Sequence, residues 1–148
     1  MRVVPVAEFE ALMFNPMPPK VVAGIEAICK LHKLWEAADR EKALAEVAPR
    51  IQAIAAGGGH ARLDGAMMSR FPKLKIVSSF GVGYDHIDAV WAGQNGIVVT
   101  NTPDVLNDEV ADTTMGLLLN TVRRFPQAEN WLREGRWKRE GAFPLTPL

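Results

Sequence analysis

The sequence predicts an α/β fold built around a parallel sheet. Short apolar runs with strand character alternate with longer stretches whose apolar residues have helical spacing, which is typical of successive βαβ units. The chain has 148 residues, of which 48% are apolar. That length allows one buried core and is too short for two complete domains. We therefore expect one domain followed by an appendage.

The strands and helices of the predicted domain follow from this alternation. Five strands are predicted, at Val3–Ala7, Leu31–Trp35, Ile51–Ala55, Leu74–Ser79 and Ile97–Asn101. Helices are predicted to begin near Lys20, Glu36, Asp64 and Asp85. Five strands joined by four helical crossovers predict a flavodoxin-like layer sandwich over residues 1–103.

Glycine and proline mark several boundaries of these elements. Gly57-Gly58-Gly59 ends the third strand, and Asn95-Gly96 predicts a left-handed turn before the fifth. Pro5 lies inside the first predicted strand and has no amide hydrogen for the ladder. We therefore expect that strand to be short or to begin beside Pro5.

The character of the chain changes after Asn101. Thr102-Pro103-Asp104 predicts a turn, and Asn107 is expected to cap a helix that runs to about Phe125. The three consecutive leucines Leu117–Leu119 span roughly 200° of the helix circumference at about 100° per residue, which is wider than one apolar stripe. We expect this helix to be covered on more than one side.

The last forty-odd residues are predicted to form a helical arm. Pro126 permits a new helix, and Trp131, Leu132 and Trp137 either form an exposed protein interface or pack against the chain's own domain. The end, Phe143–Leu148, is apolar and rich in proline. We expect it to be a linker that leads to a domain missing from this chain.

Composition excludes several classes of function. Lysine and arginine equal aspartate and glutamate, 17 of each pair, so no basic surface broad enough for nucleic acid is expected. Glu8 and Glu10 interrupt the apolar start of the chain, and we expect neither a signal peptide nor a membrane span, and a cytoplasmic protein. The single cysteine, Cys29, excludes an internal disulfide or a multi-cysteine metal site, and a small buried apolar role is expected.

The most informative stretch is Phe80–Asp88, which follows the fourth predicted strand. Gly81 and Gly83 allow a tight turn and leave backbone amides uncovered. Ligands of parallel sheets gather beyond the carboxyl ends of the strands, so these amides are candidates for binding a carboxylate. The same glycines also fit a tight strand-to-helix turn without a ligand.

Several blocks in order resemble one enzyme family. They are Gly81–Asp88, Gly96–Pro103, Val110–Asp112 and Arg123-Arg124. Over about residues 74 to 141 the chain resembles the D-2-hydroxyacid dehydrogenases, and Leu34–Ala37 and Gly135–Trp137 are most similar to the glyoxylate and hydroxypyruvate reductase branch. The resemblance implies NAD or NADP as the cofactor and a short 2-oxo or 2-hydroxy acid as the substrate.

The resemblance also implies roles for individual residues. Val82 and Gly83 would offer amides to the substrate carboxylate, and Asn101 would lie at the mouth of the cleft. Gly58, in the loop after the third strand, would border the substrate, and Thr114 would face the nicotinamide. Residues 105–140 would form an arm that embraces a second subunit, so a homodimer is expected.

The catalytic residues of the family are expected to lie outside this chain. Its Gly-x-Gly-x-x-Gly turn, carbonyl-polarising arginine and glutamate–histidine pair come later in the sequence, so we expect no catalytic residue and no activity from the fragment alone. His86, between Asp85 and Asp88, is expected to have a capping or surface role. Neither His32 nor His60 shows a pattern that predicts a partner, and Arg123 and Arg124 are expected to be structural.

Two other classes of function are compatible with the predicted fold. A receiver-like binding module would need a phosphorylatable aspartate at the end of the third strand, where Gly57-Gly58-Gly59 stands instead. A dinucleotide-sensing corepressor related to the same family would bind a partner protein without turnover, and no residue points to it specifically.

Overall fold

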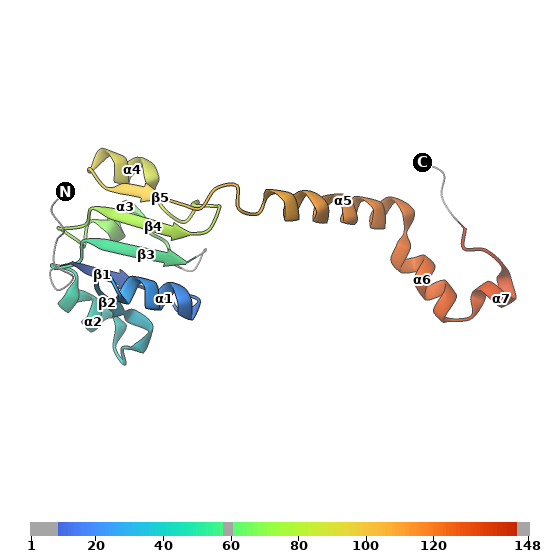
Figure 1. Ribbon diagram of the computed structural model, residues 1–148, viewed down its shortest axis with the longest axis horizontal. Helices are drawn as coiled ribbons and strands as arrows, with labels where there is room; N and C mark the ends of the chain where they lie inside the picture. The colour runs from blue at the N-terminus through green and yellow to red at the C-terminus, as the bar shows by residue number, and fades with distance from the viewer. Residues whose placement is uncertain (1–8, 58–60, 145–148) are drawn as a thin grey trace. The chain divides into compact units, whose positions relative to one another are not determined.

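The structure is a computed structural model that describes residues 9–57 and 61–144. The chain divides into two compact units, residues 1–105 and 106–148. The first unit contains the sheet and four α-helices, and the second is helical (Figure 1).

A five-stranded parallel sheet forms the first unit, which confirms the predicted fold. Its strands are β1 (Glu10–Met13), β2 (Lys30–Lys33), β3 (Ala53–Gly57), β4 (Ile76–Phe80) and β5 (Val98–Thr100). Their order is β2-β1-β3-β4-β5, and every neighbouring pair is parallel. This is the flavodoxin-like order, in which the chain reverses direction across the sheet beside β1.

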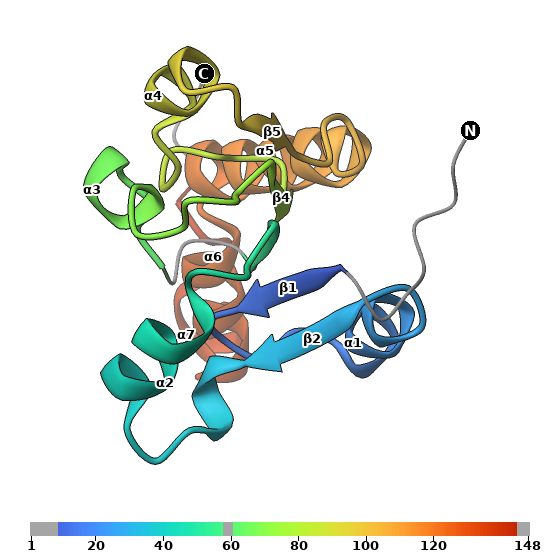
Figure 2. The same ribbon diagram turned by 90° about the vertical axis from the view of Figure 1, so that its left-hand side faces the viewer.

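The helices of the first unit are α1 (Pro19–Glu26), α2 (Arg40–Val47), α3 (Gly65–Met68) and α4 (Ala89–Gln94). The main core joins Leu12 and Ile54 of the sheet to Leu44 of α2, Met68 of α3 and Ala92 of α4. Side chains alternate between the faces of a strand, so the neighbours of Leu12 and Ile54 point to the opposite face. Helix α1 lies on that opposite face (Figure 2).

The first strand of the described sheet is one that the sequence analysis did not predict. Val3–Ala7 lies outside the described residues, and the strand that precedes β2 in the sheet is β1, which was not predicted. The run Glu10–Met13 begins with a glutamate and has four residues, so it lacks the apolar alternation that identifies a strand. Its last three residues are nevertheless buried.

Two helix starts also differ from the prediction. Strand β2 ends at Lys33, a 3-10 turn follows over Leu34–Glu36, and α2 begins at Arg40 rather than near Glu36. The reason is the cap of α2, since the Asp39 carboxylate accepts a hydrogen bond of 3.0 Å from the Lys42 amide.

Helix α4 begins at Ala89 rather than near Asp85. Its cap is Asp88, whose carboxylate accepts from the Trp91 amide at 2.9 Å. The residues before it are held by a bridge between Leu63 and Ile87. The predicted start near Asp64 is confirmed, because Asp64 caps α3, and the predicted left-handed turn is confirmed by a φ of +73° at Gly96.

The second unit consists of α5 (Asn107–Arg123), α6 (Phe125–Arg133) and α7 (Arg136–Glu140). Leu106, not Asn107, is the cap residue of α5, so that prediction was wrong by one position. Arg124 adopts a left-handed conformation between α5 and α6. None of the three helices contains a buried residue.

A cluster around Trp131 joins α6 to α7. The Trp131 indole donates a hydrogen bond of 3.0 Å to the Gly141 carbonyl oxygen and meets the Phe143 ring edge to face. The Arg136 guanidinium stands 3.6 Å from the centre of the Trp131 ring. Trp131 therefore packs within its own unit, whereas Trp137 is 55% exposed.

Candidate site for a substrate carboxylate

The candidate site is the loop that follows β4. Strand β4 pairs with β3 up to Gly57 and Phe80, and the chain then leaves the sheet at Gly81. In a parallel sheet the carboxyl ends of the strands meet at one edge. The end of β5 at Thr100 is therefore brought beside the loop, because Ser78 and Thr100 are register partners.

Two hydrogen bonds from the residues after β5 hold the loop. The Asn101 side-chain amide donates to the Val82 carbonyl oxygen at 2.8 Å, and the Thr102 backbone amide donates to the Gly81 carbonyl oxygen at 3.0 Å. Two consecutive carbonyl groups of the loop are thus fixed in direction. The structure brings Val82, Gly83 and Asn101 together. The Asn101 side-chain amide is used in its hydrogen bond to the loop.

The amides of the loop are available to a ligand. Neither the Val82 nor the Gly83 backbone amide donates to any acceptor in the described part of the chain. Both residues are exposed, Val82 to 39%. Backbone amides that are fixed in direction and lack acceptors are suited to bind a carboxylate.

Gly83 has room for a small side chain. A Cβ there would stand 3.4 Å from a carboxylate oxygen of the exposed Asp85, which is an ordinary contact, and the φ of Gly83 does not lie in the left-handed region. Only a larger side chain would narrow the space around the neighbouring amides.

The described structure does not test the roles of the other predicted site residues. Gly58 lies outside the described residues, although Gly57 before it pairs with Phe80. Thr114 lies on α5 in the second unit, and its hydroxyl donates to the Val110 carbonyl oxygen at 2.7 Å. Their roles stay predictions.

His86 has a different environment from the predicted cap or surface position. It is half-buried, and its Nε2 atom is buried without a hydrogen-bond partner. Its carbonyl oxygen accepts from the Leu63 amide at 2.8 Å. The His86 backbone therefore links the end of the loop to the segment before α3.

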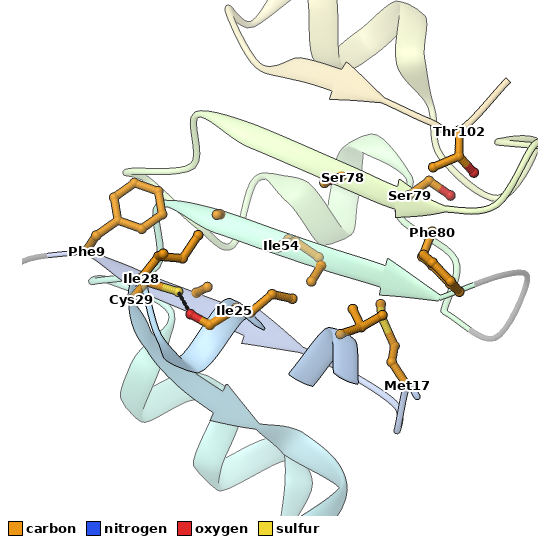
Figure 3. Close-up of a pocket in the computed structure, with 14 residues that line it drawn as sticks. Phe9, Met17, Ile25, Ile28, Cys29, Ile54, Ser78, Ser79, Phe80 and Thr102 are labelled. Atoms are coloured by element: carbon orange, nitrogen blue, oxygen red, sulfur yellow. Dashed lines mark hydrogen bonds between the residues drawn. The ribbon is translucent and has the colours of Figure 1, made fainter. Parts of the chain in front are cut away.

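A pocket of about 350 Å³ on the α1 face of the sheet is separate from the loop amides (Figure 3). Its walls are apolar apart from Ser78, Ser79, Thr102 and Cys29, and none of its lining residues is charged. It therefore offers no cation to a carboxylate. Cys29 is 5% exposed, its thiol donates to the Ile25 carbonyl oxygen at 3.3 Å, and burial raises its pKa. The prediction of a buried apolar role for Cys29 is confirmed.

The main ionic cluster lies at the opposite edge of the sheet. Glu10, the first residue of β1, contacts His32 at 2.6 Å and Arg50 at 3.2 Å, and Lys30 lies 3.9 Å away. Burial raises the pKa of Glu10, but hydrogen bonds from His32 and Arg50 outweigh it and lower the pKa below the ordinary value. No partner was predicted for His32, because its partner belongs to the strand that sequence reasoning missed.

Comparison with known proteins identifies the family. The model of the D-isomer specific 2-hydroxyacid dehydrogenase catalytic domain matches residues 11–140. The chain belongs to this family. The match contains the loop, Asn101 and all of α5 and α6, and it confirms the resemblance on which the site residues were predicted.

Relatives within this dehydrogenase family are reductases of 2-oxo acids. The chain is 39% identical over 135 residues to hydroxyphenylpyruvate reductase of Plectranthus scutellarioides. These 135 residues make up 91% of this chain and 42% of the relative. It is similar to the crystal structure of a 2-hydroxyacid dehydrogenase from Ketogulonicigenium vulgare, with a TM-score of 0.81, 39% identity and coverage of 96% and 44%.

A third relative was crystallised with ligands. It is the NADPH-dependent glyoxylate/hydroxypyruvate reductase of Sinorhizobium meliloti, solved in complex with NADP and malonate, with a TM-score of 0.74 and 46% identity. That match covers 96% of this chain and 43% of the other. The chain thus spans less than half the length of these three relatives. No helix in the part of the chain that the structure describes is long and apolar enough to cross a membrane.

Proposed function

We propose that this chain is the substrate-side portion of an NAD(P)-dependent reductase of short 2-oxo acids, such as glyoxylate or hydroxypyruvate. Residues 1–103 would form the substrate-binding domain and residues 104–148 a linker and dimerisation arm. The observation that supports it is the loop after β4. Its Gly81 and Val82 carbonyl groups are held by Thr102 and Asn101, while the Val82 and Gly83 amides have no acceptor among the residues that the structure describes.

The chain's own residues would bind and orient the substrate. The two amides would donate hydrogen bonds to the carboxylate, and the carbonyl group to be reduced would then project from the loop. Because the loop is already held, little conformational freedom would be lost on binding. Binding and orientation are what these residues contribute to catalysis.

The cofactor would supply the hydride when bound. The sequence contains no Gly-x-Gly-x-x-Gly turn, so the pyrophosphate of NAD or NADP would be held by protein beyond this chain. Thr114 is the residue proposed to approach the nicotinamide. Its hydroxyl hydrogen is used within α5, so only its oxygen lone pairs would be available.

A homodimer through residues 105–140 forms part of the proposal. Helix α5 exposes Val110, Met115, Leu117, Leu118 and Leu119, each by 47% or more, and has no buried residue in its own chain. An apolar helix of this kind is stabilised by a partner that covers it.

Titration of the isotope-labelled 148-residue chain with oxalate, followed by amide chemical shifts, tests the proposed site. Oxalate is a two-carbon dicarboxylate close in size to glyoxylate, and we expect the Val82 and Gly83 signals to move most. The Gly83→Val variant should lose this response, because a branched side chain beside the Gly83 amide would hinder the approach of the carboxylate.

Gly93→Val is the matched control, since Gly93 lies in α4 with open space around its Cβ position. It should bind oxalate as the unmodified chain does. In the full-length parent, Gly83→Val should abolish reduction of glyoxylate and hydroxypyruvate. If saturating oxalate leaves the loop signals of the unmodified chain in place, the proposed carboxylate site is wrong.

A further inference from the structure

Ser79 is the one buried polar side chain in the core of the described chain. The residue is 2% exposed, and its hydroxyl oxygen is buried without a hydrogen-bond partner. A hydroxyl group in such a position loses its bonds to water and gains none, which disfavours the fold. Its neighbour Ser78 differs, since it points to the opposite face and its hydroxyl accepts from Thr100 at 3.1 Å.

The Ser79 hydroxyl lies close to the start of the candidate loop. Its oxygen is 3.9 Å from the position that a Cβ on Gly81 would occupy. The carbonyl oxygen of Gly83 is 3.7 Å from the same position. The hydroxyl and the carbonyl therefore both border the space that Gly81 leaves empty.

The Gly83 carbonyl group is also without a partner. Along the loop, the carbonyl of Gly81 accepts from Thr102 and that of Val82 accepts from Asn101, but no hydrogen bond reaches the carbonyl of Gly83 within the described residues. The loop thus has two held carbonyl groups and a third that is free. An unused donor, the Ser79 hydroxyl, borders the same space beside Gly81.

We propose that Ser79 is a positioning residue of the carboxylate site, whose hydroxyl donates a hydrogen bond to the Gly83 carbonyl oxygen when the loop binds its anion. Thr102 and Asn101 already hold the carbonyl groups of Gly81 and Val82. The bond from Ser79 would hold the third carbonyl, and with it the peptide plane between Gly83 and Tyr84 that closes the loop. Because both groups are unpaired in the free chain, the anion-bound arrangement gains a bond that the free arrangement lacks. This inference rests on the proposed function, since it requires a carboxylate at the loop.

Ser79→Ala tests the proposal because affinity and stability should respond differently. Removing an unpaired buried hydroxyl should leave the thermal midpoint of the chain unchanged or raise it. The same change should weaken oxalate binding by about fivefold, the effect of one ordinary hydrogen bond. Ser78→Ala is the control, and it should leave the oxalate affinity unchanged.

Gly81→Ala provides a second variant that does not alter Ser79. Its methyl group would meet only ordinary van der Waals contacts, and the φ of Gly81 does not lie in the left-handed region, so the fold should accept it. The methyl group would occupy the space that the Ser79 hydroxyl and the Gly83 carbonyl both border, 3.9 and 3.7 Å from them. We expect a similar loss of affinity, and the double variant should bind no more weakly than either single variant.

The outcomes separate this inference from the proposed function. If the unmodified chain does not bind oxalate at the loop, the proposed carboxylate site fails. If the unmodified chain binds oxalate and Ser79→Ala binds it equally well, the carboxylate site stands and the proposed role of Ser79 is overturned. A loss of affinity that tracks a lowered thermal midpoint would likewise overturn the inference, because it would show a purely structural role.

Discussion

Replacement of Leu118 by aspartate is expected to convert the proposed dimer into a monomer. Leu118 lies in the middle of α5 and is 51% exposed. Full burial of an exposed leucine side chain contributes roughly 1.5–3 kcal/mol, so covering the exposed half contributes about 1 kcal/mol. A twofold interface contains each residue twice, so the two Leu118 side chains together contribute about 2 kcal/mol.

The size of the effect depends on the residue introduced. Leu118→Ala should weaken association by about 30-fold, because about 1.4 kcal/mol corresponds to a tenfold change in the dissociation constant. Leu118→Asp should weaken it much further, since removal of a carboxylate from water costs several kcal/mol more. Sedimentation velocity over a micromolar dilution series would measure both changes.

Val90→Asp is the matched control for this experiment. Val90 is 73% exposed on α4, in the first unit, and its replacement should leave the dimer intact. A chain that sediments as a monomer at every concentration would refute the proposed dimer. A dimer that survives Leu118→Asp unchanged would show that the leucine-bearing face of α5 lies outside the interface.

Two predictions concern the stability of the first unit. Burial raises the pKa of Glu10, but its hydrogen bonds to His32 and Arg50 outweigh burial and lower the pKa in the fold. The stability that ionised Glu10 contributes is therefore present above its unfolded pKa and is lost as the pH falls through its folded pKa. Urea unfolding at about pH 6 and about pH 3 should therefore show a smaller loss of stability for Glu10→Gln than for the unmodified chain, and equal losses would contradict this. Gly65→Ala should destabilise the first unit by about 1–3 kcal/mol, because its Cβ would stand 2.8 Å from the Trp91 ring. Gly93→Ala is the control, since its Cβ would lie in open space, and it should not destabilise the unit. Equal thermal midpoints for the two variants would refute the clash.

The parallel sheet could be predicted because most of its strands are short apolar runs between helical segments. The strand β1 could not, because Glu10 at its start reads as a surface residue. In the fold, Glu10 is surrounded by Arg50 and His32, which come from distant positions in the sequence. A partly buried carboxylate can be recognised only when its basic partners are known, and these follow from the pairing of β1 with β2 and with β3.

Helix starts were misplaced where several acidic residues compete as caps. The segment Tyr84–Asp88 offers both Asp85 and Asp88, and the bridge between Leu63 and Ile87 decides in favour of Asp88. Local preference cannot make this choice, because either aspartate satisfies a helix N-terminus equally well.

The position of the candidate loop was predicted, and the contacts that shape it were not. Two glycines after a buried strand indicate the turn. The bond from Asn101 to the Val82 carbonyl depends on the register of β4 with β5, and the unpaired Ser79 hydroxyl depends on which face of β4 it occupies. Neither could be read from a motif.

The attachment of the loop to residues 101 and 102 has a consequence for the order in which the protein assembles. The segment that orders the loop is the last part of the first unit to be synthesised, and it is in place only after β5 has joined the edge of the sheet. A nascent chain that ends just after the glycine turn therefore lacks the two hydrogen bonds from Asn101 and Thr102 that hold this turn. Binding competence should appear late in folding, together with the closing strand, so an intermediate that lacks β5 would be compact and unable to hold an acid.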